Sequence, residues 1–197
     1  MPGRSKAPVV KLKPDVPKIV EAVLLLVREA QRRRQAITQY DIVKSFFLAD
    51  RNHLNRYGRP ITFDNYYAMK HGPVPTFTYN LLKEQERELA EVGGSLPWHR
   101  EGRPIGNAFD FYPDREPDED CMAPSEVEAL LDSFATVKSL GFNQVRKLTH
   151  EDAAYVDAWE GDEENDNGSY AMSLSMLLDV PDPALAQDLA FVSKNAM

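Results

Sequence analysis

The chain has 197 residues, of which 43% are hydrophobic and 27% are charged, so it can bury a core and is not a disordered chain. No apolar run approaches the roughly 18 residues of a membrane span, and we expect no secretory signal because no apolar segment adjoins the basic N-terminus. The single cysteine, Cys121, excludes an internal disulfide and a multi-cysteine zinc site, and we expect a cytoplasmic protein.

Charge is distributed unevenly along the chain. The net charge is -8, yet residues 1–60 carry 13 lysine and arginine residues against 5 aspartate and glutamate residues. Residues 61–197 carry 10 basic residues against 26 acidic ones. Because binding to duplex phosphates needs a net basic surface, we expect that nucleic acid is not the main partner.

The first predicted elements are a basic arm and a helix. Residues 1–16 are basic and contain three prolines, which predicts an extended arm, loosely ordered unless a partner holds it. Pro17 suits the first turn of a helix, and apolar residues at helical spacing predict an amphipathic helix over residues 17–34. Arg32, Arg33 and Arg34 then fit a solvated helix end, with a phosphate-binding patch as the alternative.

A second helix is predicted over residues 38–56. Thr38 followed by Asp41 is typical of a capping box with Asp in place of Glu. Asp50 lies on the apolar stripe of this helix, four residues after Phe46. A carboxylate in a core position must find hydrogen-bond donors or stay neutral, so Asp50 is either a buried structural partner or a catalytic carboxylate.

Residues 57–76 are dense in turn formers. We expect a short helix or turn over residues 62–70, with Tyr66, Tyr67 and Met69 directed mainly toward the core. Gly72, Pro73 and Pro75 are expected to shape the backbone between two helices. The following helix is predicted over residues 76–91, with Thr76 as its N-cap and two glycines as its stop.

The second half of the chain predicts one small β element and further helices. Alternating residues predict a two-stranded β element within residues 95–112, with a turn around 103–106. Ser125 and Glu128 predict a capping box for a helix that ends at Gly141. Shorter helices are predicted at 143–148, at 151–159 and within 173–193, the last broken by two prolines. Together these elements predict a mainly α protein, a single compact multi-helix domain with a small two-stranded β element.

Two acidic loops are predicted at 114–120 and 162–168. The second fails as a calcium-binding EF-hand loop, because Leu174 stands where the motif requires a bidentate glutamate. No phosphate-binding loop, dinucleotide fingerprint, HExxH motif or nucleophile elbow is present, and no two histidines are spaced as a helical metal-ligand pair. We therefore expect no cofactor, no metal and no catalytic residue, and a binding protein rather than an enzyme.

Several segments together resemble a known family. The run YDIVKSFFLADRNHL at 40–54, followed by YGRPIT at 57–62, resembles the opening of the Panacea domain of SocA-like antitoxins. The run YAMKHGPVP at 67–75 resembles the central Gly-Pro-Val signature of that family. The helix at 124–140, the run LTHE at 148–151 and Trp159 are similar to its later segments, so the resemblance covers roughly residues 38–160.

The resemblance implies a mainly helical antitoxin module of bacterial or phage origin. It divides the chain into the arm at 1–16, a Panacea-like domain with an N-terminal extension helix at 17–160, and an acidic loop and tail at 161–197. The implied partner is a cognate toxin protein, such as a toxic small alarmone synthetase or another translation inhibitor, and in one branch a Clp-type protease as well. The N-terminal extension is expected to be specific to the partner, because it lies outside the shared core.

The resemblance also directs attention to particular residues. Candidate partner-binding residues are Arg32, Arg33, Arg59, Tyr66 and Lys70. Candidate structural signature residues are Asp50, Gly72, Pro73, Pro75 and His150. We expect Asp50 to pair within the 57–76 segment, including with Lys70 or His71.

Four functions stay open from the sequence. The chain is an antitoxin that binds a toxin, or an adaptor that presents a toxin to a protease. Alternatively it is a small hydrolase or nucleotide-handling enzyme that uses Asp50, His71 and His150, or a DNA-binding autoregulator that uses Arg32–Arg34. The charge split favours capture of a basic toxin cleft by the acidic part of the chain.

Overall fold

The computed structural model describes residues 6–161 and 167–195 and confirms the mainly α fold. The described residues form seven α-helices: α1 (Val16–Arg32), α2 (Gln39–Tyr57), α3 (Thr76–Leu82), α4 (Glu86–Glu91), α5 (Pro124–His150), α6 (Ala153–Ala158) and α7 (Pro183–Asn195). They also form five short strands: β1 (Tyr66–Met69), β2 (Gly72–Pro75), β3 (Trp98–Gly102), β4 (Phe109–Pro113) and β5 (Tyr170–Ala171). Two 3-10 turns, η1 (Glu119–Cys121) and η2 (Leu174–Leu177), complete the order. No described helix is long and apolar enough to cross a membrane.

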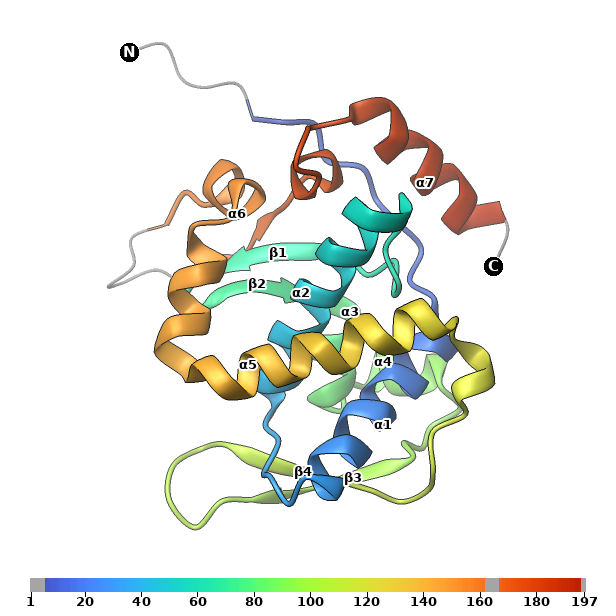
Figure 1. The fold of residues 1–197 in the computed structure, drawn as a ribbon, viewed down its shortest axis with the longest axis vertical. Coiled ribbons are helices and arrows are strands. Elements are labelled where there is room, and N and C mark those ends of the chain that lie inside the picture. The colour runs from blue at the N-terminus through green and yellow to red at the C-terminus, as the bar shows by residue number, and fades with distance from the viewer. Residues whose placement is uncertain (1–5, 162–166, 196–197) are drawn as a thin grey trace.

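Helix α1 lies in the core of the molecule. Asp15 caps it by accepting a hydrogen bond from the Lys18 backbone N–H (3.2 Å). Most of its apolar residues, including Ile19 and Leu24, are fully buried, and the helix packs against α5 and β4. Figure 1 shows α5 crossing over both α1 and α2. The predicted extension helix is therefore a part of the core on which the rest of the fold packs.

Helix α2 is buried on more than one side. Its predicted capping box is confirmed, because the Thr38 side chain accepts from the Asp41 backbone N–H and the Asp41 carboxylate accepts from Thr38. Helix α5 packs on one side, while β2 and α3 also pack against α2 (Figure 1). A helix in this position buries polar residues that would face solvent on an ordinary amphipathic helix.

The prediction of a short helix or turn over 62–70 is wrong. Strand β1 pairs antiparallel with β2, so that Tyr66 lies opposite Pro75 and Met69 opposite Gly72. Strand β5 pairs with the other edge of β1. Prolines lack the backbone N–H that a central strand needs, which suits β2 to the edge of this three-stranded sheet. Strands of four residues are too short for their alternation to be recognised in the sequence.

The single helix predicted over 76–91 is two helices. The chain breaks between α3 and α4, where Glu84 has a φ of +58°. Thr76 is not the N-cap, which is Pro75, and the Thr76 hydroxyl donates instead to the Asn65 carbonyl (3.0 Å). The predicted two-stranded β element is confirmed as the antiparallel pair β3 and β4.

Helix α5 begins earlier than predicted and consists of two helical parts separated by a kink at the predicted end, Gly141. Its first turn is closed by Glu126, whose carboxylate accepts from the Ala123 backbone N–H (2.8 Å), so the predicted box of Ser125 and Glu128 is two residues too late. Gly141, the predicted stop, has φ 70° and ψ 175° and interrupts the helix there. The chain then resumes a helical path to His150, so the predicted helix at 143–148 forms the second part of α5.

The arm is extended, as predicted, but it is not loosely ordered from residue 6 onward. Lys6 Nζ donates to the Ala158 carbonyl (2.8 Å), and the Lys13 backbone N–H donates to Ser193 Oγ (3.0 Å). Leu12 is buried in a second apolar cluster that also contains Leu189 and Ala190 of α7. The two ends of the chain therefore stabilise each other. The acidic loop predicted at 162–168 lies mostly outside the described residues.

Candidate partner-binding site

Asp50 is at the centre of a closed hydrogen-bond network. Its carboxylate accepts from the backbone N–H groups of Ile61 (2.7 Å) and Thr62 (3.0 Å), from the Tyr66 hydroxyl (2.8 Å) and from the Thr62 hydroxyl. Burial raises the pKa of Asp50, and these hydrogen bonds oppose the rise. The partners come from the predicted 57–76 segment, but they are not Lys70 or His71. Asp50 therefore joins α2 to the chain that leads into β1.

A second buried carboxylate, Asp64, explains how α3 starts without a cap of its own. It accepts from the backbone N–H groups of Phe77 (3.0 Å) and Thr78 (2.8 Å), which lie in the first turn of α3. It also accepts from the Thr78 hydroxyl (2.8 Å) and the Asn65 backbone N–H (2.7 Å). Burial raises the pKa of Asp64 to about 6, against the opposing effect of these hydrogen bonds. A carboxylate remote from the helix thus takes the place of the predicted cap at Thr76.

Glu126 joins the start of α5 to two other segments. Its carboxylate binds Lys18 Nζ of α1 (3.0 Å) and Arg59 Nη1 after α2 (2.6 Å). Burial raises the pKa of Glu126, but the hydrogen bonds from Ala123, Lys18 and Arg59 outweigh it and hold the pKa below its usual value. Arg59 is therefore part of a structural ion-pair cluster.

Lys44 is a buried cation next to the Gly-Pro-Val signature. Its side chain is almost inaccessible, and Nζ donates to the Pro73 carbonyl (2.7 Å) and lies 5.4 Å from the centre of the Tyr40 ring. Burial lowers the pKa of Lys44 well below its usual range. No carboxylate in the described part of the chain forms an ion pair with it.

Gly72 is required where the signature meets Lys44. Its φ of +98° is a conformation that L side chains rarely adopt. A Cβ atom there would lie 2.6 Å from Thr149 Oγ1 and 2.9 Å from Lys44 Nζ. The signature therefore holds the β1–β2 turn against both α2 and the last turn of α5.

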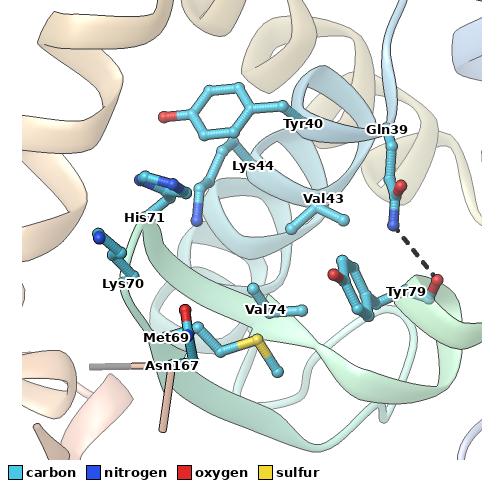
Figure 2. Close-up of a pocket in the computed structure, with 10 residues that line it drawn as sticks. All are labelled: Gln39, Tyr40, Val43, Lys44, Met69, Lys70, His71, Val74, Tyr79 and Asn167. Carbon is cyan, nitrogen blue, oxygen red and sulfur yellow. Dashed lines mark hydrogen bonds between the residues drawn. The ribbon is translucent and has the colours of Figure 1, made fainter. Parts of the chain in front are cut away.

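A cavity of about 450 Å³ opens beside Lys44. We call it the Lys44 cavity, and these residues line it: Gln39, Tyr40, Val43, Lys44, Met69, Lys70, His71, Val74, Tyr79 and Asn167. In Figure 2 the nitrogen atoms of Lys44, Lys70 and His71 lie toward one end, and Val43, Val74 and Met69 lie toward the other. The cavity therefore has a basic end and an apolar end. Its volume is within the range of ordinary ligand pockets.

An aromatic surface adjoins the basic end of the cavity. The Phe142 ring, 49% exposed, lies 4.7 Å from the Tyr40 ring and 5.7 Å from the His71 ring, measured between centroids. Leu140, on the other side of the Gly141 kink, is 41% exposed. Burial lowers the pKa of His71, and nearby Arg146, Lys70 and Lys44 lower it further. We call Tyr40, His71, Leu140 and Phe142 the kink surface.

The predicted partner-binding residues are not brought together. Arg32 and Arg33 are exposed at the end of α1, where both pair with Glu29. Tyr66 is buried, and its hydroxyl is committed to Asp50. Of the five, only Lys70 lines the Lys44 cavity.

The structural signature residues divide between the two sites. Asp50 belongs to the closed network, and Pro75 occupies the N-cap position of α3 without a side-chain cap hydrogen bond. Gly72 and Pro73 contact Lys44, and the missing Cβ of Gly72 would lie 3.5 Å from the His150 ring. Lys44 is not among the residues predicted from the sequence, although its position between Val43 and the buried Phe46 and Phe47 indicates that it faces the interior.

The carboxylate of the enzyme hypothesis is not hydrogen-bonded to either of its histidines. Asp50 is enclosed by Ile61, Thr62 and Tyr66, whereas His71 is exposed at the mouth of the Lys44 cavity. His150 stacks on Tyr155, with 4.4 Å between ring centroids. Within residues 6–161 and 167–195, no group of three or more His, Cys, Asp or Glu side chains is arranged to hold a metal ion.

In the folded protein, many charged residues of the basic first part of the chain form ion pairs with the acidic later part. Basic residues of the first 60 pair with carboxylates of the later part of the chain, namely Lys6 with Glu160, Lys18 and Arg59 with Glu126, Arg28 with Glu116, and Arg51 with Asp152 and Asp179. Two basic residues of the later part pair the other way, Arg115 with Glu21 and Lys138 with Asp41. A simple division into a basic and an acidic half therefore does not describe the folded protein.

The comparison with protein families gives one match. Residues 42–155 match the family model described as antitoxin SocA-like, Panacea domain. The match contains most of α2, the signature, the Gly141 kink and the first half of α6, but it leaves out α1 and α7. No curated protein and no solved structure matches the chain.

Proposed function

The chain belongs to the family of SocA-like antitoxins with a Panacea domain, and from this premise we propose that it neutralises a cognate toxin protein in the cytoplasm by binding it directly. The family match over residues 42–155 is the observation that carries the proposal. The activity proposed is binding and not catalysis. The toxin would be a protein whose action arrests growth, such as a translation inhibitor.

We assign the toxin contact to the kink surface and the adjoining Lys44 cavity. Exposed aromatic and apolar side chains beside a concave site are typical of the centre of a protein interface. Phe142 and Leu140 are held outward because Gly141 breaks the helix between them. Tyr40 fixes this geometry, since its hydroxyl donates to the Phe142 carbonyl (3.3 Å).

The rigid supports of this surface favour direct neutralisation. Gly72 and Lys44 hold the β1–β2 turn, and α5 packs on α2 along much of its length. A surface that is already in place before binding loses little conformational entropy when a partner docks. Capture of the toxin therefore needs no further component.

The test uses the gene next to the one that encodes this chain. Its product is expressed alone, where we expect growth arrest, and then together with this chain, where we expect rescue. The same pair is expressed in a host that lacks Clp-type proteases, and rescue is expected there as well. Rescue that disappears without the protease would show an adaptor, and a neighbouring product without toxicity would contradict the assignment to this gene pair.

A substitution on the kink surface tests the proposed contact. Phe142→Asp places a charge at the centre of the surface and is expected to weaken the purified complex at least about tenfold. Phe191→Asp is the matched control, because Phe191 is exposed on α7, outside the family match. Equal weakening by both variants, or by neither, would place the toxin elsewhere.

A further inference from the structure

We propose that the Lys44 cavity is a binding site for a carboxylate group carried on an apolar stem, with Lys44 Nζ as the group that receives the carboxylate. The site lies beside the kink surface, and the first of the two sources named next rests on the proposed function. The carboxylate has two sources, an acidic side chain of the toxin or a free small carboxylic acid.

The basic end of the cavity selects an anion. Lys44, Lys70 and His71 line it, and Arg146 is close enough to lower the pKa of His71 by its charge. Lys44 has three N–H donors, of which one is used by the Pro73 carbonyl. An entering carboxylate would accept a charge-assisted hydrogen bond from Lys44 in a site that is largely screened from water.

The apolar end selects the stem. Val43, Val74 and the Met69 side chain line this end, and Tyr79 lies at its edge (Figure 2). The Tyr79 carbonyl already accepts from the Gln39 side chain (3.4 Å). An aliphatic chain placed there would lose contact with water and gain contact with these side chains.

Lys44 is poorly explained as a purely structural residue. A buried cation costs free energy unless its surroundings compensate it, and its compensation here is one carbonyl and one aromatic ring. Burial lowers the pKa of Lys44, which is the behaviour of an amine that lacks an anionic partner in the described structure. A ligand carboxylate is the missing partner that the geometry accommodates.

The test measures small probes by NMR on the intact isotope-labelled chain. Sodium hexanoate is the probe, and 1-hexanol is the matched control that has the same stem without the charge. At about pH 6, where carboxylates are ionised, we expect saturable shifts of the backbone signals of Tyr40, His71 and Gly72 with hexanoate. Hexanol is expected to bind at least about tenfold more weakly.

Three variants connect the probe to the site. Lys44→Met replaces the lysine with an unbranched apolar side chain that is one atom shorter, and it is expected to remove the tenfold preference for hexanoate. Lys70→Gln, at the mouth of the cavity, leaves the core intact and is expected to weaken hexanoate about two- to threefold. Lys194→Met, on the exposed part of α7, is the control and should bind hexanoate as the wild type does.

The outcomes separate this inference from the proposed function. Hexanoate binding that is absent, or that is equal in wild type and Lys44→Met, overturns the inference, whatever the wild-type chain does to the toxin. When binding depends on Lys44, the affinity of the purified toxin identifies the source. Loss of toxin binding in Lys44→Met indicates a toxin side chain, and unchanged toxin binding indicates a free carboxylic acid.

Discussion

Asp50 and Lys44 are two buried titratable groups on α2, and they differ in the partners that surround them. Asp50 is enclosed by two backbone N–H groups and two hydroxyls, so its oxygens are fully engaged. Lys44, less than two turns earlier on α2, has one carbonyl and one ring beside it and borders a cavity. A buried charge whose partners are all supplied by the fold stabilises the fold. A buried charge beside open space is available to a ligand.

Both groups lie within the family match over residues 42–155. Asp50 binds segment 60–66 to α2, and Asp64 within this segment binds it to α3, so that together they fix the position of β1. Strand β1 in turn positions the turn that carries His71 and Gly72 against Lys44. The hydrogen-bonded carboxylates Asp50 and Asp64 therefore hold the backbone that forms one wall of the Lys44 cavity.

The largest effect on stability is expected when the hydrogen-bond network around Asp50 loses its central carboxylate. Asp50→Ala leaves the backbone N–H groups of Ile61 and Thr62 and the hydroxyls of Thr62 and Tyr66 without their buried acceptor. We expect the free energy of unfolding to fall by about 3–5 kcal/mol, measured by urea denaturation. A loss below about 1 kcal/mol would show that the network is not what holds segment 60–66.

The second largest effect on stability is expected at Gly72, where the β1–β2 turn meets Lys44 and Thr149. Gly72→Ala introduces a Cβ atom 2.6 Å from Thr149 Oγ1 at a φ of +98°, and we expect a loss of about 2–4 kcal/mol. Gly58→Ala is the matched control, because Gly58 has a φ of +76° and nothing within 4 Å of the added atom. The control should lose only about 1 kcal/mol. Equal losses would mean that backbone strain, and not contact with Lys44 and Thr149, decides the need for glycine.

Much of this organisation follows from local sequence, and the rest does not. The cap at Thr38, the helix in the first 34 residues and the β3–β4 pair depend on neighbouring residues, so the sequence predicts them. Asp50 is recognisable in the sequence because a carboxylate on an apolar stripe is unusual.

The misses share a cause, which is contact between residues far apart in the chain. The cap of α3 comes from Asp64, twelve residues before Thr76, and the arm is ordered by α7 at the other end of the chain. Lys44 lies on a helix that is covered on several sides, and the sequence does not reveal the second cover. The feature of the sequence that indicates such burial is a lysine within one helical turn of apolar neighbours.

The third effect concerns pH and the closed carboxylates. The pKa of Asp64 is raised to about 6, so its proton binds the folded protein more tightly than the unfolded one. The stability that this proton adds is present at low pH and is lost as the pH rises through about 6. Between pH 7 and pH 5 we expect the stability of the wild type to gain about 1–1.5 kcal/mol relative to Asp64→Asn, which lacks this proton.

The measurement is the difference between the two proteins at each pH. Other carboxylates, such as Glu21 and Glu126, have lowered pKa values and act in the opposite direction, but they are present in both proteins and cancel. A difference that is flat from pH 5 to pH 7 would mean that Asp64 stays ionised in the folded protein.

The smallest effect on stability is expected at Lys44, and it is the sharpest test of the comparison. Lys44→Met removes a buried charge and one hydrogen bond to Pro73, and it fills the same space with an apolar chain. Replacing a buried charged group by an apolar one of similar size is often neutral or stabilising, so we expect the free energy of unfolding near pH 7 to change by less than about 1 kcal/mol. Because burial lowers the pKa of Lys44, the unfolded wild type binds the proton more tightly, and the wild type should gain stability relative to Lys44→Met as the pH rises toward 10. A loss near pH 7 as large as that of Asp50→Ala would make Lys44 a structural residue like Asp50, and the distinction between a closed support and an open site would fail.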